Sequence, residues 1–500
     1  MDYKKLQNGS DIRGVALEGI EGQHVNLTEE VCRNIGRGFA LWLRERLSKD
    51  DLRVAVGRDS RLSGEMLCGW LCGAMCEQGV HVTDIGMAST PAMFMSTVTG
   101  ETPYDASVMI TASHLPFNRN GFKFFTADGG LEKQDIAAIL AYAAGDGVTG
   151  LAPAKLEKGT FMDAYAAILV DKVRSATGEE RPLEGFRIVV DAGNGAGGFY
   201  VEKVLQPLGA DTTGSQFLEP DGSFPNHIPN PEDEKAMEAI TKAVADNQAD
   251  FGIIFDTDVD RAGAVLSDGS ELNRNRIIAM LAAILTREYP GTTIVTDSIT
   301  STGLAAFIEK LGGVHHRFKR GYRNVINEAI RLNNNGQDCQ LAMETSGHGA
   351  FKENYFLDDG AYIVTKLLIE LARGKKEGYK LESLIADLAE PAESKEFRMN
   401  ILLEDFKPYG LEVLDKLQAY AAGQPGWSIA PNNYEGVRVN LDEAHGNGWF
   451  LLRMSLHDPL MPLNIESDSV GGVKTIAREL AGFLLLCDKL NTEKLAEYVK

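Results

Sequence analysis

Residues 252–261 read GIIFDTDVDR, an apolar run followed at once by three alternating aspartates and an arginine. The Ile-rich run is typical of a buried β-strand, and the residues after it lie in the loop where that strand ends. Three carboxylates beside an apolar strand repel one another unless a cation neutralises them. We expect Asp256, Asp258 and Asp260 to converge on Mg²⁺, which prefers oxygen ligands, although a solvated acidic turn is the alternative. An EF-hand is excluded, because position 12 of the loop, counted from Asp256, is Ser267 and not the Glu that an EF-hand requires.

The same order of apolar run, turn residues and helical stretch recurs along most of the chain. Apolar runs at 53–56, 107–111 and 187–190 alternate with helical stretches such as 29–47 and 64–78. Alternating strands and helices are the signature of an α/β fold.

The last hundred residues read differently, because three apolar runs there surround one helical stretch and a second helix follows. A small antiparallel α+β domain is therefore expected at the C-terminal end. Polar, Pro-rich or Gly-rich stretches interrupt the chain near 150, 270 and 392. The four predicted domains span residues 1–155, 156–270, 271–391 and 392–500.

The composition of the chain argues against nucleic acids and membranes as binding partners. The chain has 50 Lys and Arg against 71 Asp and Glu, a net charge of −21, which repels nucleic acids and anionic membrane surfaces. The longest apolar run, at 277–285, is about half the length that spans a bilayer. Six cysteines in 500 residues are too few for a disulfide framework and favour a reducing, cytoplasmic location. Cys68, Cys72 and Cys76 form a helical row, which we interpret as a packed stripe because no His or fourth Cys lies nearby in sequence.

A serine loop follows the strand-like run at 107–110. Residues 111–116 read TASHLP and residues 120–123 read NGFK. A serine on a turn beyond a strand is exposed and flanked by backbone N–H groups, which suits it to accept and hold a phosphoryl group. A Ser-His pair in a loop is also common as a structural feature. The loop does not match GxSxG, so a hydrolase nucleophile elbow is disfavoured.

Two further loops carry polar side chains after apolar runs. Residues 344–349 read ETSGHG, in which Glu, Ser and His could bind sugar hydroxyls and move a proton, or serve as capping and turn residues. Residues 453–459 read RMSLHDP, in which Arg, Ser and His could clamp a phosphate, with a surface turn as the alternative.

Taken in order, these four loops resemble those of the α-D-phosphohexomutase family, which includes phosphoglucomutases, phosphomannomutases and phosphoglucosamine mutases. The resemblance covers nearly the whole chain. Supporting motifs are DIRG at 11–14, VGRD at 56–59, TP at 90–91 and DAGNG at 191–195. The family fold implied is α/β, with four domains around a central cleft: three related mixed-sheet α/β domains and a smaller C-terminal α+β domain.

The resemblance also implies an activity, namely interconversion of hexose 1-phosphate and 6-phosphate, of glucose or mannose, by a phosphoserine enzyme through a 1,6-bisphosphate. It implies Mg²⁺ as cofactor, glucose 1,6-bisphosphate or a related bisphosphate as activator, sugar phosphates as partners, and a monomer or homodimer. The implied catalytic residues are Arg13, Ser113, Lys123 and His348; the metal ligands are Ser113, Asp256, Asp258 and Asp260; the substrate-binding residues are Arg261, Lys319, Glu344, Ser346, Arg453, Ser455 and His457.

The sequence departs from the family pattern at several points. The usual phosphate loop resembles RPSGTEP, but here Leu456 replaces the Gly and His457 replaces the Thr. Thr257 and Val259 stand in the metal loop where glycines are common. A looser grip on the bisphosphate would let it escape, so a sugar 1,6-bisphosphate-forming phosphotransferase is an alternative function.

Two rival interpretations remain open at the level of sequence. The run IIFDTDVD also resembles the start of an aspartyl-phosphate phosphatase, in which Asp256 would be the nucleophile. The altered loop at 453–459 suits a non-catalytic sensor that only binds sugar phosphate, although the intact metal triad argues against it.

Overall fold

The structure is a computed structural model that describes residues 2–455 and 458–500. The chain forms two compact units, one made of Met1–Leu281 and Ser346–Leu384, the other of Ala282–Thr345 and Ile385–Lys500. Among the described residues, no helix combines the length and the apolar character needed to cross a membrane.

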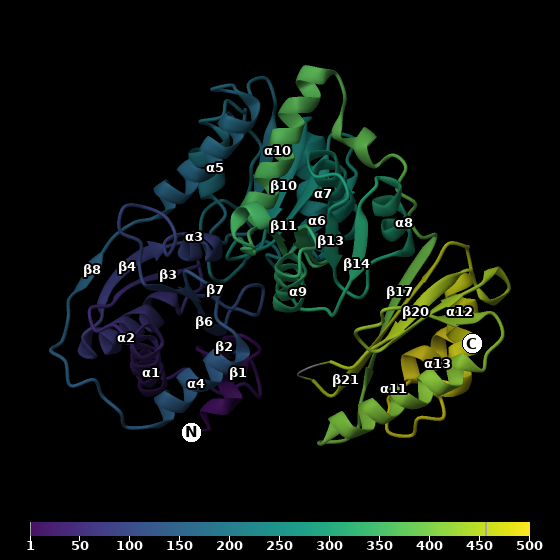
Figure 1. Ribbon diagram of the computed structural model, residues 1–500, viewed down its shortest axis with the longest axis horizontal. Coiled ribbons are helices and arrows are strands. Elements are labelled where there is room, and N and C mark those ends of the chain that lie inside the picture. Colours follow the sequence, from purple (N-terminus) through teal and green to yellow (C-terminus); the bar gives the residue numbers. More distant parts are fainter. Residues whose placement is uncertain (1, 456–457) are drawn as a thin grey trace. The chain divides into compact units, whose positions relative to one another are not determined.

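The first unit begins with a mixed sheet whose strand order is β1-β2-β6-β5-β3-β4-β8, with β7 beside β6. Figure 1 shows α1, α2 and α4 together beside this sheet, where their apolar faces share one core with the strands. The strands are β1 (Gln7–Asn8), β2 (Asp11–Val15), β3 (Arg53–Arg58), β4 (His81–Met87), β5 (Ala106–Ile110), β6 (Arg119–Thr126), β7 (Gly129–Gly130) and β8 (Leu156–Lys158). The helices are η1 (Tyr3–Leu6), α1 (Glu29–Leu47), α2 (Gly64–Glu77), α3 (Thr90–Met95) and α4 (Lys133–Ala144).

A second, smaller sheet follows in the same unit. Its order is β12-β11-β10-β9, in which β9 and β10 are parallel and the β10–β11 and β11–β12 pairs are antiparallel. The strands are β9 (Ile188–Asp191), β10 (Phe251–Phe255), β11 (Ala262–Leu266) and β12 (Glu271–Leu272), and the short strand β16 (Gly349–Phe351) also lies in this unit. The helices are α5 (Met162–Thr177), the π-helical turn η2 (Val201–Leu205), α6 (Glu234–Asn247), η3 (Lys352–Asn354) and α10 (Gly360–Glu377), and α10 packs against α5.

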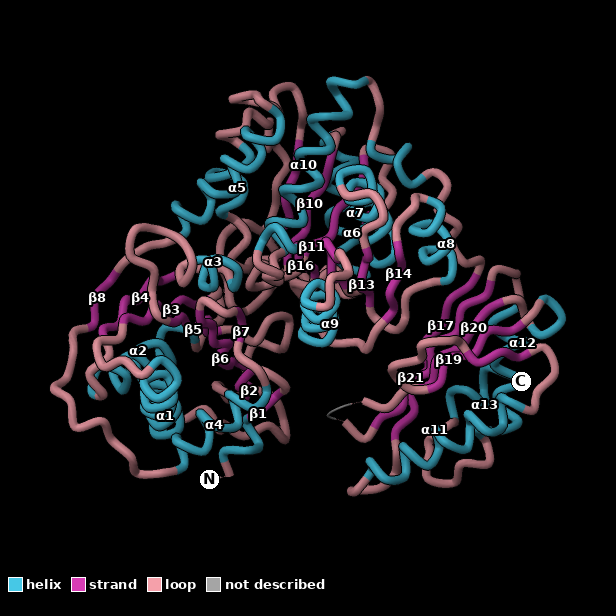
Figure 2. Tube along the Cα trace, in the orientation of Figure 1, coloured by secondary structure: helices cyan, strands magenta, loops and turns pink. Residues whose placement is uncertain are grey.

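The second unit contains a parallel set of strands in which β13 lies between β14 and β15. It ends in an antiparallel sheet of order β17-β21-β20-β19-β18, which Figure 2 shows beside α11, α12 and α13. The strands are β13 (Thr293–Thr296), β14 (Val314–Arg317), β15 (Cys339–Met343), β17 (Glu393–Asn400), β18 (Trp427–Ile429), β19 (Val437–Leu441), β20 (Gly448–Leu452) and β21 (Leu460–Ser467). The helices are α8 (Thr302–Lys310), α9 (Tyr322–Asn334), α11 (Phe406–Ala422), η5 (Glu443–His445), α12 (Gly472–Leu484) and α13 (Glu493–Val499), while α7 (Arg274–Glu288) and η4 (Leu381–Ile385) cross the unit boundaries.

The expected α/β architecture with a smaller C-terminal α+β domain is therefore confirmed. The cysteine row is also confirmed as packing, because Cys68, Cys72 and Cys76 lie in the core between α2 and the first sheet. All six cysteines lie within the described residues, and all six are free thiols.

Candidate active site

The serine loop and the metal loop meet in the first unit. The loop after β5 presents Ser113, and the loop after β10 begins with Asp256. The Ser113 hydroxyl donates a hydrogen bond to Asp256 Oδ2 at 2.8 Å, and Arg261 Nη2 donates one to Ser113 Oγ at 2.9 Å. Ser113 is half-buried, whereas Asp256 and Arg261 are buried. The serine oxygen is thus held between a carboxylate and a guanidinium and still reaches solvent.

The serine loop is held in an unusual backbone conformation. Ser113 has a φ of +50°, a left-handed value that costs a non-glycine residue free energy unless its surroundings impose it. Its N–H donates to Thr111 Oγ1 at 2.8 Å. Arg13 forms an ion pair with Asp11 at 2.8 Å and donates a hydrogen bond to the Thr111 carbonyl. Arg13 therefore stabilises the backbone of the serine loop and does not contact the serine oxygen.

Arg61, which the sequence analysis did not single out, supports the same loop. Its side chain donates to the carbonyls of Ser113 and Leu115, and also to those of Pro116 and Arg119. Burial lowers the pKa of its guanidinium. A single buried arginine therefore satisfies four loop carbonyls, which is a geometric reason for the turn that exposes Ser113.

The three predicted metal ligands converge. Asp256, Asp258 and Asp260 are buried, and each offers an oxygen within 4.8 Å of the others. Burial raises the pKa of Asp256, and the negative charges of Asp260 and Asp258 raise it further. The Oδ1 atoms of Asp258 and Asp260 have no hydrogen-bond partner in the part of the chain that the structure describes. Buried, unsatisfied carboxylate oxygens are costly, so this donor set fits a divalent cation.

The metal loop shows strain at one of the positions that departs from the family pattern. Val259 has a φ of +66°, a region that β-branched residues rarely occupy, and it is fully buried. Its N–H donates to the Asp256 carbonyl at 3.3 Å, which closes the turn that brings the aspartates together.

Positive and hydroxyl groups surround the aspartates. Lys123, on β6, contacts Asp258 Oδ2 at 3.1 Å and also pairs with Asp260. The Thr90 hydroxyl, at the start of α3, donates to Asp258 Oδ2. Burial opposes ionisation of Asp260, but Lys123, His348 and Arg261 outweigh it and lower the pKa of that carboxyl. Lys123 thus contacts two of the three carboxylates of the metal loop.

His348 also lies beside the aspartates. Its Nδ1 is 2.5 Å from Asp358 Oδ2 and 3.9 Å from Asp260 Oδ1. Burial lowers the pKa of the imidazole, but Asp358 and Asp260 outweigh it and raise the pKa to about 9. His348 is therefore an imidazolium at neutral pH, and Asp358 positions it.

His114 takes the opposite protonation state. Burial and the nearby Arg261 hold the pKa of His114 at about 3, so its ring is neutral. Its Nδ1 lies 2.6 Å from Arg261 Nη2 and accepts a hydrogen bond there. His114 thus helps to orient the guanidinium that contacts the serine.

The remaining predicted residues are divided between the units. Ser346, in the first unit, is buried, and its hydroxyl has no partner among the described residues. In the second unit, Glu344 Oε1 accepts the Gly321 N–H at 2.5 Å, and Lys319 is exposed. Arg453 Nη1 lies 3.9 Å from Glu435 Oε1.

The last predicted loop is described only in part. The Ser455 hydroxyl accepts the Asp458 N–H at 3.2 Å, and the Ser455 N–H donates to the Leu460 carbonyl at 2.8 Å. His457 lies outside the described residues, as does Leu456.

The structure thus places most of the predicted residues in two sets, each within its own unit. The first unit holds Arg13, Ser113, Lys123, Asp256, Asp258, Asp260, Arg261, Ser346 and His348, and the second holds Lys319, Glu344, Arg453 and Ser455. The contacting residues that the sequence analysis gave no role are Arg61, Thr90, His114, Asp358 and Glu435. Thr90 and His114 lay in recognised motifs, whereas Arg61, Asp358 and Glu435 lay outside the quoted motifs and are placed by the contacts of the folded chain.

The chain resembles known proteins along nearly its whole length. Residues 4–146, 161–269 and 273–391 match the three family models described as phosphoglucomutase/phosphomannomutase, alpha/beta/alpha domains I, II and III. A phosphomannomutase/phosphoglucomutase of Pseudomonas putida is 31% identical over 464 residues, covering 92% of each chain. A phosphoglucomutase of Neisseria gonorrhoeae is 30% identical over 462 residues, covering 92% of this chain and 93% of the relative. The crystal structure of a phosphoglucomutase/phosphomannomutase family protein from Burkholderia thailandensis is similar, with a TM-score of 0.77 and 28% identity. The match covers 96% of this chain and 97% of that chain.

Proposed function

Because this chain belongs to the α-D-phosphohexomutase family of phosphoglucomutases and phosphomannomutases and is a hexose-phosphate mutase, we propose that it interconverts the 1- and 6-phosphates of glucose or mannose through a phosphoserine at Ser113. The observation that carries this proposal is the position of the Ser113 oxygen between Asp256 Oδ2 and Arg261 Nη2.

The proposed reaction has two transfers. In the first, the phosphorus–Oγ bond of phosphoserine breaks, a sugar hydroxyl oxygen takes the phosphoryl group, and the hydroxyl proton is released while Oγ gains one. In the second, Oγ attacks the other phosphate of the 1,6-bisphosphate and loses its proton, the bond between that phosphorus and the sugar oxygen breaks, and the sugar oxygen takes up a proton. The net result is an isomerised monophosphate and a regenerated phosphoserine.

The chain's own groups supply positive charge and protons. Arg261 donates to Oγ, where negative charge develops as the phosphorus–oxygen bond breaks. Lys123, which pairs with Asp260, and the imidazolium of His348 are the proton-transfer groups of the proposal. Arg13 holds the loop that presents Oγ.

We assign the metal site to Asp256, Asp258, Asp260 and the Ser113 side chain. Mg²⁺ bound there supplies positive charge that offsets charge on the phosphoryl oxygens. The unsatisfied Oδ1 atoms of Asp258 and Asp260 support this assignment.

We assign substrate recognition to side chains of two chemical types. Glu344 and Ser346 would bind sugar hydroxyls, and Lys319, Arg453, Ser455 and His457 would hold the phosphate that does not react, with bisphosphate as activator. Support comes from the donor types, because Arg and Lys are the usual partners of phosphate.

The phosphatase alternative assigns the nucleophile to Asp256 instead. Asp256 is fully buried, and its Oδ2 accepts hydrogen bonds from both Ser113 and Arg261, whereas Ser113 is accessible. A nucleophile must reach its substrate, so this difference favours Ser113.

The test compares wild type with Ser113→Ala, with Ser223→Ala at an exposed turn as the matched control. Conversion of glucose 1-phosphate and mannose 1-phosphate is measured with Mg²⁺ and catalytic glucose 1,6-bisphosphate. Ser113→Ala is expected to lose turnover by about a thousandfold or more because the phosphoryl carrier is gone, and Ser223→Ala is expected to keep it.

Three outcomes would contradict or change the proposal. Wild-type turnover by Ser113→Ala would overturn it. Steady release of 1,6-bisphosphate by wild type, in place of isomerised monophosphate, would select the bisphosphate-forming alternative. Sugar-phosphate binding without any turnover by wild type would select the sensor.

A further inference from the structure

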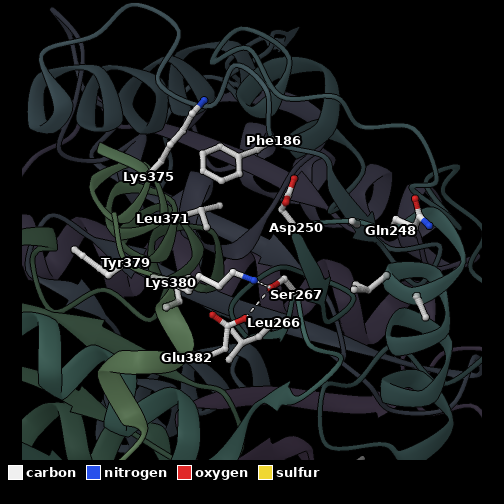
Figure 3. Close-up of a pocket in the computed structure, with 14 residues that line it drawn as sticks. Phe186, Gln248, Asp250, Leu266, Ser267, Leu371, Lys375, Tyr379, Lys380 and Glu382 are labelled. Carbon is white, nitrogen blue, oxygen red and sulfur yellow. Dashed lines mark hydrogen bonds between the residues drawn. The ribbon is translucent and has the colours of Figure 1, made fainter. Parts of the chain in front are cut away.

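Besides an open one beside Gln7 and Lys133, two cavities among the described residues lie away from the serine and metal loops. The larger, of about 540 Å³, lies in the first unit between the start of β10 and the end of α10 (Figure 3). Its lysines contact protein groups: Lys375 donates to the Glu184 carbonyl, and Lys380 Nζ lies 3.5 Å from Ser267 Oγ. Figure 3 shows Lys380 extended toward Ser267, which also donates to Glu382.

The smaller cavity, of about 240 Å³, lies in the second unit, where β14 faces the loop at 430–435 and strand β19. We call it the Arg438 cavity. The lining residues that matter here are Ser298, His315, Arg317, Tyr434, Glu435 and Arg438.

Arg438 is a buried cation with an unused donor. Its side chain is 2% exposed, and its guanidinium carbon lies 3.5 Å from the centroid of the Trp449 ring. Nη1 donates to the Ser298 carbonyl at 2.9 Å. Nη2 has no hydrogen-bond partner among the described residues. A buried guanidinium with an unsatisfied N–H is costly, so a ligand that accepts this hydrogen bond would be favoured.

A second guanidinium lines the same cavity. Arg317 donates to Thr300 Oγ1 at 3.1 Å and to the carbonyls of Thr300 and Ser301 at 3.2 Å, all of which are neutral acceptors. Burial lowers the pKa of Arg438 and of Arg317, and Arg317 lowers that of Arg438 further. Burial and both arginines also lower the pKa of His315, which is therefore neutral.

The nearby carboxylates have other partners. Glu466 accepts from Trp449 Nε1 at 3.0 Å, and Asp297 accepts from the Thr345 hydroxyl at 2.8 Å. Glu435, which lines the cavity, accepts from the Ser298 hydroxyl and from the Arg320 N–H. Glu309, the other carboxylate in the lining, is exposed. The described residues thus place no carboxylate within ion-pair distance of Arg317 or Arg438.

We propose that the Arg438 cavity binds a phosphate dianion, as inorganic phosphate or as the phosphate of a small phosphomonoester. Two adjacent guanidiniums carry two positive charges, so they match a phosphate dianion better than they match one singly charged carboxylate. Their N–H groups also fit the arrangement of the phosphate oxygens. The cavity equals the liquid volume of about eight waters, which leaves room beyond a bare phosphate.

This site is separate from the one that the proposed function assigns to the substrate phosphate. Lys319, Arg453 and Ser455 do not line the Arg438 cavity. Glu435 stands between them, because its Oε2 accepts from Ser298 while its Oε1 lies 3.9 Å from Arg453 Nη1. The two phosphate sites can therefore be removed one at a time.

The test measures binding of inorganic phosphate by calorimetry to protein that carries Arg453→Ala, so that the proposed substrate site does not contribute. One site per chain is expected. Adding Arg438→Met is expected to weaken phosphate binding at least tenfold, because a buried donor is lost. The control adds Arg398→Met instead, at an exposed arginine on β17 that pairs with Glu396, and is expected to leave phosphate binding unchanged.

Glycerol 2-phosphate distinguishes the two sources of phosphate: displacement of inorganic phosphate by the ester indicates a phosphomonoester, and no displacement indicates inorganic phosphate itself. Phosphate binding that survives Arg438→Met unchanged would overturn the proposal. If that variant does not fold, wild-type crystals are soaked in tungstate, an analogue of phosphate. Tungstate density beside Arg438 is the expected result, and its absence would overturn the proposal. Wild-type turnover is measured separately, so the proposed function and this site can fail independently.

Discussion

Each cation around the serine and the aspartates has a carboxylate partner. Lys123 pairs with Asp258 and Asp260, and Arg261 pairs with Asp256 at 3.2 Å. Buried charges are tolerated when they are paired and hydrogen-bonded. By contrast, Oδ1 of Asp258 and Oδ1 of Asp260 have no hydrogen-bond partner among the described residues, which supports the proposed cation site.

Binding of Mg²⁺ should therefore stabilise the folded protein. Mg²⁺ at a hundredfold excess over its Kd adds about 2.7 kcal/mol to the free energy of unfolding. We expect thermal unfolding to show this rise in wild type and in Asp268→Asn, an exposed turn residue, but a much smaller rise in Asp258→Asn. We also expect EDTA to abolish turnover and added Mg²⁺ to restore it. Equal melting curves with and without Mg²⁺ would contradict the metal assignment.

Glu466 makes a second prediction at the scale of one residue. Burial raises the pKa of this carboxyl to about 7, although Arg438 and the Trp449 N–H oppose the rise. Between about pH 4.5 and 7 the folded state then holds a proton that the unfolded chain has lost. The free energy of unfolding therefore falls as pH rises through this window.

The Glu466→Gln side chain cannot ionise, and it keeps an oxygen that accepts the Trp449 hydrogen bond. The free energy of unfolding of this variant should therefore not decrease between pH 4.5 and 7 through this group. We expect the variant to exceed wild type by about 1–3 kcal/mol in unfolding free energy at pH 8 and to match it near pH 4.5. Denaturant unfolding across pH 4.5–8 measures this, with exposed Glu443→Gln as the control. Parallel pH profiles for wild type and Glu466→Gln would refute it.

Among the elements, the pairing of β2 with β6 joins two predicted catalytic residues. Gly121 on β6 is the Cα partner of Arg13 on β2, and Lys123 lies two residues further along β6. A Cβ on Gly121 would lie 2.0 Å from the Ile12 carbonyl oxygen, so only glycine allows this approach.

Gly121→Ala should force the strands apart and lower the free energy of unfolding by about 1–3 kcal/mol. Activity should fall as well, because Arg13 holds the serine loop. Gly69→Ala is the matched control, since a Cβ there meets no atom within 4 Å and α2 gains a better helix former. Unfolding by denaturant measures both, and an equally stable Gly121→Ala would show that β2 and β6 are not constrained as described.

Periodicity predicted the elements well where local sequence controls them. The helical stretches at 29–47 and 64–78 correspond to Glu29–Leu47 and Gly64–Glu77, and the run at 107–111 corresponds to Ala106–Ile110. The left-handed Ser113 could not be predicted, because the Arg61 side chain that holds its loop lies 52 residues away.

For the whole chain, the motifs predict that four loops carry the chemistry, and contacts distant in sequence determine which compact unit each loop belongs to. The sugar loop is divided, because Glu344 belongs to the second compact unit whereas Ser346 and His348 belong to the first. Sequence spacing alone carries no sign of this division. The clustering of Asp256, Asp258 and Asp260 was predictable, since three carboxylates within five residues share one loop.

Locating the phosphoryl group on the chain shows whether Ser113 carries it. Purified protein is treated with glucose 1,6-bisphosphate and Mg²⁺, and the modified residue is mapped by peptide mass spectrometry, with hydroxylamine treatment to cleave any acyl phosphate. We expect phosphate on Ser113 that resists hydroxylamine. An unmodified Ser113 with hydroxylamine-sensitive phosphate on Asp256 would contradict it.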